Sequence, residues 1–213
     1  MYKRQTQILT RDRHATGVRT ARSEYESKAV AAAFPLSHLF EIIDENLFTP
    51  SFVRYAKEMR SSNGVSIDFV FDQPITDRQG SILGVDVPLW VKFQTNVDPT
   101  LAPPGKQVMT WAMLNEPGMP LTDEAAARIE SHIKTIMEEL FPGALAKVVR
   151  ERKLILPKVN GVLLTPEQSF PHRPPVISKD IEGIYFIGDT VQGEGCSGDI
   201  AFSSAIKAAE AIL

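Results

Sequence analysis

The sequence has little of what disulfides, metal sites and membrane spans require. Its one cysteine, Cys196, excludes an internal disulfide and a cysteine-cluster metal site. The four histidines lie at positions without metal-ligand spacing: His14, His38, His132 and His172. We therefore expect no bound metal. Apolar runs are too short to span a bilayer, and no secretory signal pattern opens the sequence. These features favour a cytoplasmic protein and leave a peripheral membrane contact open.

Neither sign of charge is in strong excess. The formal net charge is -3 at pH 7, and no basic stripe is present, so nucleic acid is not an expected partner. The 213 residues, 43% of them hydrophobic, are enough to form one large or two small globular domains.

The first part of the chain, residues 7–35, alternates short β-forming runs with polar turns. This pattern predicts a β-meander followed by one more strand, which ends before Pro35. Residues 37–47 have apolar side chains at helical spacing, with Ser37 as a suitable N-cap, and therefore predict a helix. A second, short helix is predicted over residues 50–60.

The middle of the chain contains three segments in which apolar and polar residues alternate: residues 65–74, 88–98 and 106–114. They predict an antiparallel sheet with one face in contact with water. Phe69, Phe93 and Trp111 then either line an apolar pocket or pack a core. The longest helix is predicted over residues 121–143, capped by Thr122, and we interpret it as structural.

The most informative stretch is residues 183–213, which read GIYFIGDTVQGEGCSGDIAFSSAIKAAEAIL. The apolar run at residues 184–187 is typical of a strand in a parallel sheet. Asp189 follows the carboxyl end of that strand, where open α/β sheets bind ligands. Its carboxylate suits a sugar or polyol hydroxyl as a hydrogen-bond donor. Three glycines follow in the loop: Gly193, Gly195 and Gly198.

These glycines permit positive φ angles and let a flat ligand approach the backbone. The helix after them directs a partial positive charge from its first turn toward the same place. The simpler alternative is a strand, a turn and a capped helix that bind no ligand.

This closing stretch resembles the C-terminal flavin motif of the FAD-dependent oxidoreductases that include phytoene desaturases and flavin amine oxidases. In those enzymes a Gly-Asp pair follows the last strand and precedes a glycine loop and a helix that points at the flavin. Residues 15–43 are similar to the hairpin, strand and proline of the same family's flavin domain. The resemblance covers nearly the whole chain from Gln7.

The resemblance implies a role for each matching residue. Asp189 would hydrogen-bond the ribityl or diphosphate part of FAD, and Gly188 would allow its approach. The amides of Asp199 and Ile200 would face the N1 and C2 carbonyl edge of the flavin and raise its reduction potential. The residues expected to border the isoalloxazine ring are Gly195, Cys196, Ser197 and Gly198. We interpret Cys196 as a small residue packed near the ring, not as a covalent anchor or redox thiol.

No catalytic side chain is assigned. Lys92, His172 and Glu194 are candidates, and each is more simply explained as a solvated surface residue.

One element of such flavin enzymes is missing from the sequence. They begin with a strand, a GxGxxG loop and a helix that hold the FAD diphosphate, and this sequence has no such fingerprint. We therefore expect the chain to be the C-terminal half of a larger enzyme and to be inactive alone. Residues 1–5, MYKRQ, resemble translated adapter sequence from sequencing libraries; the alternative is a native terminus with this sequence.

The predicted fold class is α+β to α/β, with a partial FAD-binding (Rossmann-like) domain and a substrate domain built from an antiparallel sheet and helices. The expected bounds are 1–36 for the first part of the FAD-binding domain, 37–176 for the substrate-binding domain, and 177–213 for the closing strand, loop and helix of the FAD-binding domain.

The predicted function is flavin-mediated hydride transfer on an apolar small-molecule substrate by a desaturase-like or amine-oxidase-like enzyme. Oxidation, desaturation, saturation and isomerisation stay open as reactions. The alternative is a non-catalytic ligand-binding or interaction domain whose closing loop binds a nucleotide or nothing.

Overall fold

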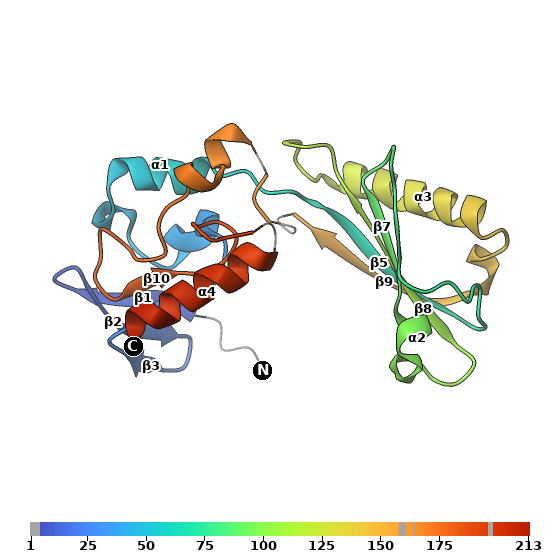
Figure 1. Cartoon of the computed structure of the whole chain (residues 1–213), viewed down its shortest axis with the longest axis horizontal. Coiled ribbons are helices and arrows are strands. Elements are labelled where there is room, and N and C mark those ends of the chain that lie inside the picture. The colour runs from blue at the N-terminus through green and yellow to red at the C-terminus, as the bar shows by residue number, and fades with distance from the viewer. Residues whose placement is uncertain (1–4, 158–160, 164, 196–197) are drawn as a thin grey trace. The chain divides into compact units, whose positions relative to one another are not determined.

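In the computed structural model, the residues described are 5–157, 161–163, 165–195 and 198–213. The chain folds into two compact units (Figure 1). The first unit comprises Met1–Arg60 and Gly161–Leu213, and the second comprises Ser61–Asn160. The chain therefore leaves the first unit once and returns to it once.

The first unit contains two small sheets. One is an antiparallel meander in the order β1-β2-β3, and the other is a parallel pair of β4 and β10. The strands are β1 (Gln5–Arg11), β2 (His14–Thr20), β3 (Glu24–Glu26), β4 (Val30–Ala32) and β10 (Ile184–Phe186). In the parallel pair, Ile184 lies opposite Val30 and Phe186 lies opposite Ala32. The predicted meander is confirmed, and the predicted closing strand pairs with a strand from near the other end of the chain.

The helices of the first unit are α1 (Pro50–Glu58), α4 (Gly198–Ile212) and four 3-10 helices, η1 (Leu36–Glu41), η2 (Glu45–Leu47), η5 (Pro166–Gln168) and η6 (Phe170–His172). The prediction of one helix over residues 37–47 with Ser37 as its cap is wrong. Helical geometry is lost at Ile42, where φ is -131°, and the Asp44 side chain accepts the Asn46 N–H to begin a separate turn. The short helix predicted after it is confirmed as α1.

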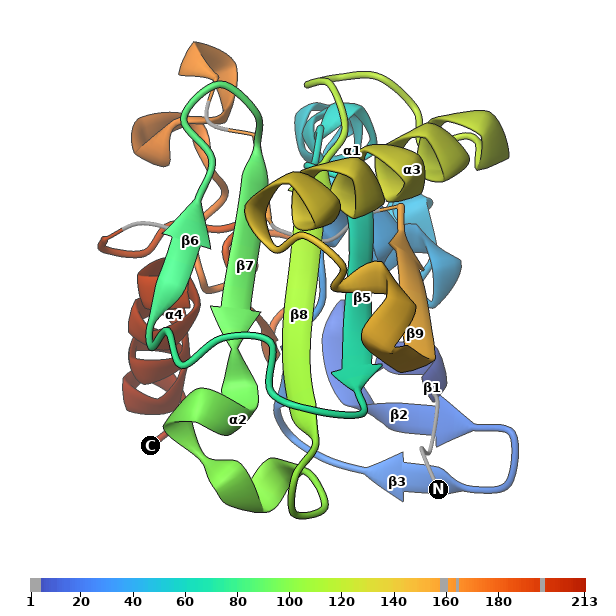
Figure 2. The same cartoon turned by 90° about the vertical axis from the view of Figure 1, so that its right-hand side faces the viewer.

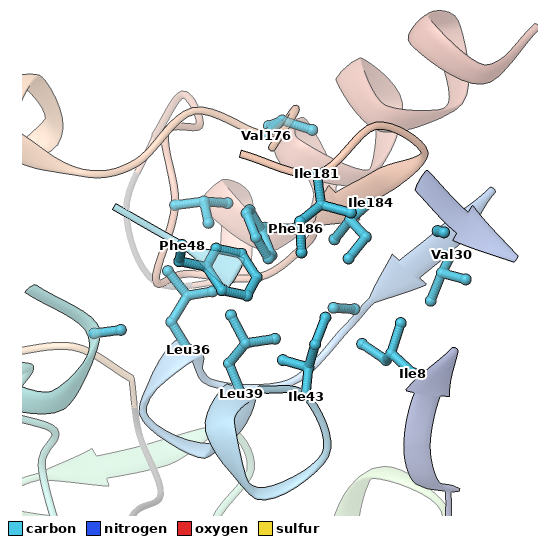
Figure 3. Close-up of a cluster of buried hydrophobic side chains, with 14 of the residues drawn as sticks. Ile8, Val30, Leu36, Leu39, Ile43, Phe48, Val176, Ile181, Ile184 and Phe186 are labelled. Atoms are coloured by element: carbon cyan, nitrogen blue, oxygen red, sulfur yellow. The ribbon is translucent and has the colours of Figure 1, made fainter. Parts of the chain in front are cut away.

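A shared hydrophobic core holds the first unit together. Figure 3 shows Leu39, Ile43 and Phe48 in one buried cluster with Ile184 and Phe186 of β10. All five side chains are at most 6% exposed.

The domain bounds predicted from the sequence differ from this division of the chain. Residues 37–60 and 161–176, assigned to the substrate domain, belong to the first unit. The physical reason is burial against the closing strand: the Phe52 ring on α1 stacks on the Phe186 ring with centroids 5.4 Å apart. Apolar periodicity identifies which side chains are buried but not the element that buries them.

The second unit is one antiparallel sheet in the order β6-β7-β8-β5-β9, with α3 (Asp123–Leu140) lying across one face (Figure 2). Its strands are β5 (Gly64–Phe71), β6 (Ser81–Leu83), β7 (Leu89–Phe93), β8 (Gln107–Leu114) and β9 (Val148–Leu156). Its short helices are α2 (Gln94–Val97), η3 (Pro99–Leu101) and η4 (Leu145–Lys147). The three predicted strands are present, except that the strand predicted over residues 88–98 ends at Phe93, where α2 begins.

The face of this sheet beneath α3 is a packed core. Phe69, Phe93 and Trp111 are 0% exposed, and Ile133 and Met137 of α3 cover them. Of the two roles considered for the three aromatic residues, core packing is therefore confirmed. Thr122 caps α3 as predicted, because its side chain accepts the Ala125 N–H.

One edge of β4 is unpaired among the residues that the structure describes. Val30 donates its N–H to Gly183 and Ala32 accepts from Ile187, so the alternation of a parallel ladder directs the Ala31 N–H and C=O to the opposite side. A pocket of about 230 Å³ lies along β4, and Ala31 is exposed. An unpaired edge of this kind accepts a further strand.

We expect the open edge of β4 to be less protected than the centre of the sheet in the second unit. The Ala31 amide should exchange with deuterium about a hundredfold faster than the Ile67 amide of central strand β5, because β5 is paired on both sides. Residues 7–35 and 181–213 should likewise be cleaved by protease before β5. Residue-resolved hydrogen exchange measures the difference, and equal protection at Ala31 and Ile67 would contradict it.

Candidate functional site

The end of β10 is held in place by a serine on α4. The Ser204 hydroxyl is 0% exposed, accepts the Gly188 N–H at 3.0 Å, and lies 3.3 Å from the Gly188 carbonyl oxygen. It also donates to the Ala201 carbonyl oxygen at 2.9 Å, as serine commonly does inside a helix. The turn after β10 is thus fixed to α4 by side-chain hydrogen bonds.

Asp189, the central residue of the predicted site, already has one partner within the protein. Its Oδ2 accepts the backbone N–H of Val162 at 3.1 Å. Gly161 makes this approach feasible, since a Cβ at that position would lie 1.9 Å from Asp189 Oδ2 and its φ is +89°. Asp189 is half-buried. A carboxylate offers about four acceptor positions, so one backbone N–H leaves Oδ1 available to another donor.

The glycines of the predicted site differ in what surrounds them. A Cβ at Gly193 would lie 2.6 Å from the Ile200 carbonyl oxygen, and a Cβ at Gly195 would lie 2.4 Å from Asp199 Cβ. Both glycines are therefore required by the close packing of the loop against the start of α4, whether or not a ligand binds.

Gly188 and Gly198 are different, because a Cβ at either would meet no atom within 4 Å. Gly188 has a φ of +130° and lies directly before Asp189. Any side chain at position 188 would occupy the open space next to the half-buried Asp189 carboxylate, and glycine leaves that space free. This geometry fits a polyol or sugar chain passing over the backbone with its hydroxyl groups directed at Asp189.

The first turn of α4 faces the same loop. The first backbone N–H groups of a helix have no partner within the helix, and its start carries a partial positive charge; in α4 these first residues are Gly198, Asp199 and Ile200. Ile200 is buried, whereas Asp199 is exposed. Two residues predicted to border the ligand, Cys196 and Ser197, lie outside the described residues.

The three candidate catalytic residues are divided between the two units. Lys92 is exposed on β7 of the second unit, and His172 is exposed in the first unit. Glu194 is exposed and pairs with Lys207 at 3.5 Å. Among the described residues, no group of three His, Cys, Asp or Glu side chains is placed to hold a metal ion. The described helices include none that is long and apolar enough to cross a membrane.

Sequence reasoning missed a second polar feature of the first unit. A pocket of about 370 Å³ has an apolar wall that includes Phe52, Pro174 and Phe186. Tyr55 also lines it, and its buried hydroxyl has no hydrogen-bond partner among the described residues. Burial raises the pKa of Tyr55, and the Arg173 guanidinium nearby partly opposes that rise. Nothing in the sequence pattern marks these side chains as neighbours.

Comparison with known proteins found a matching family model and solved structures of similar fold. A family model described as flavin containing amine oxidoreductase matches residues 3–213. No curated protein sequence matches the chain. Solved structures that share the fold include an oxidoreductase from Methanosarcina mazei, with 20% identity and a TM-score of 0.73 over 97% of this chain and 48% of that one.

Two further structures show the same fold at lower identity. A putrescine oxidase variant has 14% identity and a TM-score of 0.64, over 98% of this chain and 48% of that one. A putative protoporphyrinogen oxidase from Exiguobacterium has 12% identity and a TM-score of 0.58, over 96% and 45%. The chain thus spans about half the length of the solved structures that it matches.

We expect Asp189 to contribute to stability in the absence of any ligand. Asp189→Ala leaves the N–H of Val162 without its acceptor, and Val162 is only 9% exposed. The free energy of unfolding should therefore fall by about 1–3 kcal/mol. Asp189→Asn keeps an acceptor oxygen of similar shape and should lose less. Urea denaturation of both variants measures the difference; equal losses would show that the Val162 bond contributes nothing.

Proposed function

The chain belongs to the family of flavin-containing amine oxidoreductases, and from this premise we propose that it forms the flavin-ring and substrate end of an FAD-dependent oxidoreductase. The observation that carries the proposal is the position of Asp189. It is half-buried after the carboxyl end of β10, beside the open space at Gly188, and Oδ1 has no partner among the described residues. Bound flavin would supply the hydride acceptor or donor of the reaction.

We assign the following tasks to the residues of the site. Asp189 Oδ1 accepts a hydrogen bond from a ribityl hydroxyl, and Gly188 leaves room for that chain. The loop that includes Gly195, Cys196, Ser197 and Gly198 borders the ring system. The amides of Asp199 and Ile200 donate toward the ring edge that becomes more negative on reduction, which makes reduction easier.

We further propose that the two units have different functions, FAD binding for the first and substrate binding for the second. The first unit, with its parallel pair of β4 and β10, is part of a Rossmann-like FAD-binding domain, and the open edge of β4 is where further strands of that domain pair. The second unit is the substrate-binding domain. We assign it to the compact unit Ser61–Asn160 in place of the bounds 37–176 expected from the sequence.

The buried aromatic residues of the second unit do not indicate the class of substrate. The expectation of an apolar substrate included a pocket lined by Phe69, Phe93 and Trp111, but these side chains are 0% exposed and pack the core beneath α3. On the other face of the same sheet, Asp68 accepts hydrogen bonds from Thr110 and Arg152. A small-molecule substrate that met this face would contact hydrogen-bonding groups as well as apolar ones.

We expect flavin binding by this chain to be weak, because no GxGxxG loop is present to hold the diphosphate. Riboflavin, which carries the ring and ribityl chain alone, should shift the amide NMR signals of Gly188, Asp189 and Ile200. AMP should leave these signals unchanged. Shifts with AMP alone would favour the non-catalytic nucleotide-binding alternative. A yellow protein that keeps stoichiometric FAD through gel filtration would contradict the prediction of weak binding.

The Asp189 carboxylate should matter for flavin affinity beyond its effect on stability. Asp189→Ala should weaken riboflavin binding about tenfold to a hundredfold, the equivalent of about 1.5–3 kcal/mol, because a ribityl hydroxyl loses a charged acceptor. Asp189→Asn should weaken binding less. NMR titration gives the dissociation constants. Unchanged affinity in both variants, with equal loss of stability with and without riboflavin, would show that Asp189 has only a structural role.

A further inference from the structure

Both segments that connect the two units are held by one buried glutamine. The chain leaves the first unit after Arg60 and returns at Gly161. Gln168 is 6% exposed, and its Oε1 accepts the N–H of Arg60 at 2.6 Å. Its Nε2 donates to the Arg60 carbonyl oxygen at 3.0 Å and to the Leu163 carbonyl oxygen at 2.8 Å. Every strong hydrogen-bonding group of this side chain therefore binds the backbone of a connecting segment.

The returning segment is also bound by the carboxylate of the proposed flavin site. Leu163 donates its N–H to the Arg60 carbonyl oxygen at 2.9 Å, and the residue before it, Val162, donates to Asp189 Oδ2 at 3.1 Å. Gly161 lies directly against that carboxylate. Asp189, the returning segment, Arg60 and Gln168 thus form one continuous hydrogen-bonded network within the first unit.

Local loop stabilisation alone does not account for this arrangement. Gln168 and Arg60 are 108 residues apart in the chain, and Val162 and Asp189 are 27 residues apart. A buried amide side chain is costly unless all its groups are bonded, and a fully bonded one specifies a single arrangement of its partners. The partners that it fixes here are the points where the chain leaves and re-enters the first unit.

We propose that Gln168 and Asp189 act together as a clamp that couples flavin binding at Asp189 to the anchoring of the two connecting segments. The inference rests on the proposed flavin role of Asp189. Gln168 and Gly161 are then positioning residues that touch neither flavin nor substrate. Because coupling between two sites is reciprocal, loosening the clamp weakens flavin binding, and bound flavin tightens the clamp.

The first test needs no flavin and measures amide hydrogen exchange at Val162 and Arg60. Asp189→Ala should accelerate exchange about tenfold at the Val162 amide, which is bonded to Asp189. It should also accelerate exchange about tenfold at the Arg60 amide, which is bonded to Gln168 and not to Asp189. Asp189→Asn should restore near wild-type exchange at both amides. Faster exchange at Val162 with no change at Arg60 would overturn the clamp, even if flavin binds as proposed.

The second test compares two glycines with similar positive φ angles. Gly161 and Gly105 have φ angles of +89° and +81°, but only at Gly161 would a Cβ collide with Asp189; at Gly105 it would meet nothing within 4 Å. Gly161→Ala should weaken riboflavin binding about tenfold, whereas Gly105→Ala should leave it within about twofold. Equal affinities of the two variants would overturn the coupling.

Gln168→Met keeps the length of the side chain and removes its hydrogen bonds, so it covers the case in which Gly161→Ala fails to fold. Gln168→Met should accelerate hydrogen exchange at the Val162 amide and weaken riboflavin binding, although residue 168 contacts neither that amide nor the flavin in the proposed arrangement. If wild-type protein binds no riboflavin, the proposed function fails and the exchange data alone decide whether the clamp exists. Unchanged exchange at Val162 in Gln168→Met would count against it.

Discussion

The parallel pairing of β4 with β10 is the constraint on which the rest of the first unit depends. It joins residues 30–32 to residues 184–186, so the two ends of the chain share one sheet and one core. Because parallel strands end at the same edge, the pairing also determines where the turn at Gly188 and Asp189 lies. α4 then packs against that turn through Ser204, whose hydroxyl accepts the Gly188 N–H and donates to the Ala201 carbonyl oxygen of its own helix. The candidate site follows from this one ladder and the helix behind it.

The sequence predicted the elements whose signal is local. The alternation in β5 and β8, the Thr122 cap of α3 and the apolar run of β10 are all present as expected. The prediction was wrong where a competing local interaction decided the conformation: at Asp44, a side chain that caps its own short turn divides the expected helix in two. The sequence also placed residues 37–60 in the substrate-binding domain, whereas they belong to the first unit. Their apolar faces do not show which strand buries them.

The candidate site could be predicted only in part, for a related reason. Asp189 and the glycine loop are adjacent in the sequence, so their proximity needs no tertiary information. The partner of Asp189, the Val162 amide, is a backbone group in a distant segment and has no signature of its own. Only Gly161, an isolated glycine directly before the apolar residues 162–164, indicates a close approach there. The sequence does not show which residue makes that approach. Gln168 carries no signal at all, since its partners are main-chain groups that any residue can supply.

The bond to Val162 also changes how the Asp189 carboxylate should be understood. A carboxylate that is free to rotate must be ordered by its ligand, at a cost in conformational entropy. Here a backbone N–H fixes Oδ2, which orients Oδ1 before any ligand arrives, and preorganisation of this kind strengthens binding without adding a contact. The orientation of the carboxylate depends on how firmly the segment that contains Val162 is held. That segment is held in turn by Gln168 and by the close approach that Gly161 permits. The geometry of the proposed flavin contact therefore depends on the position of residues 161–163, where the chain returns to the first unit.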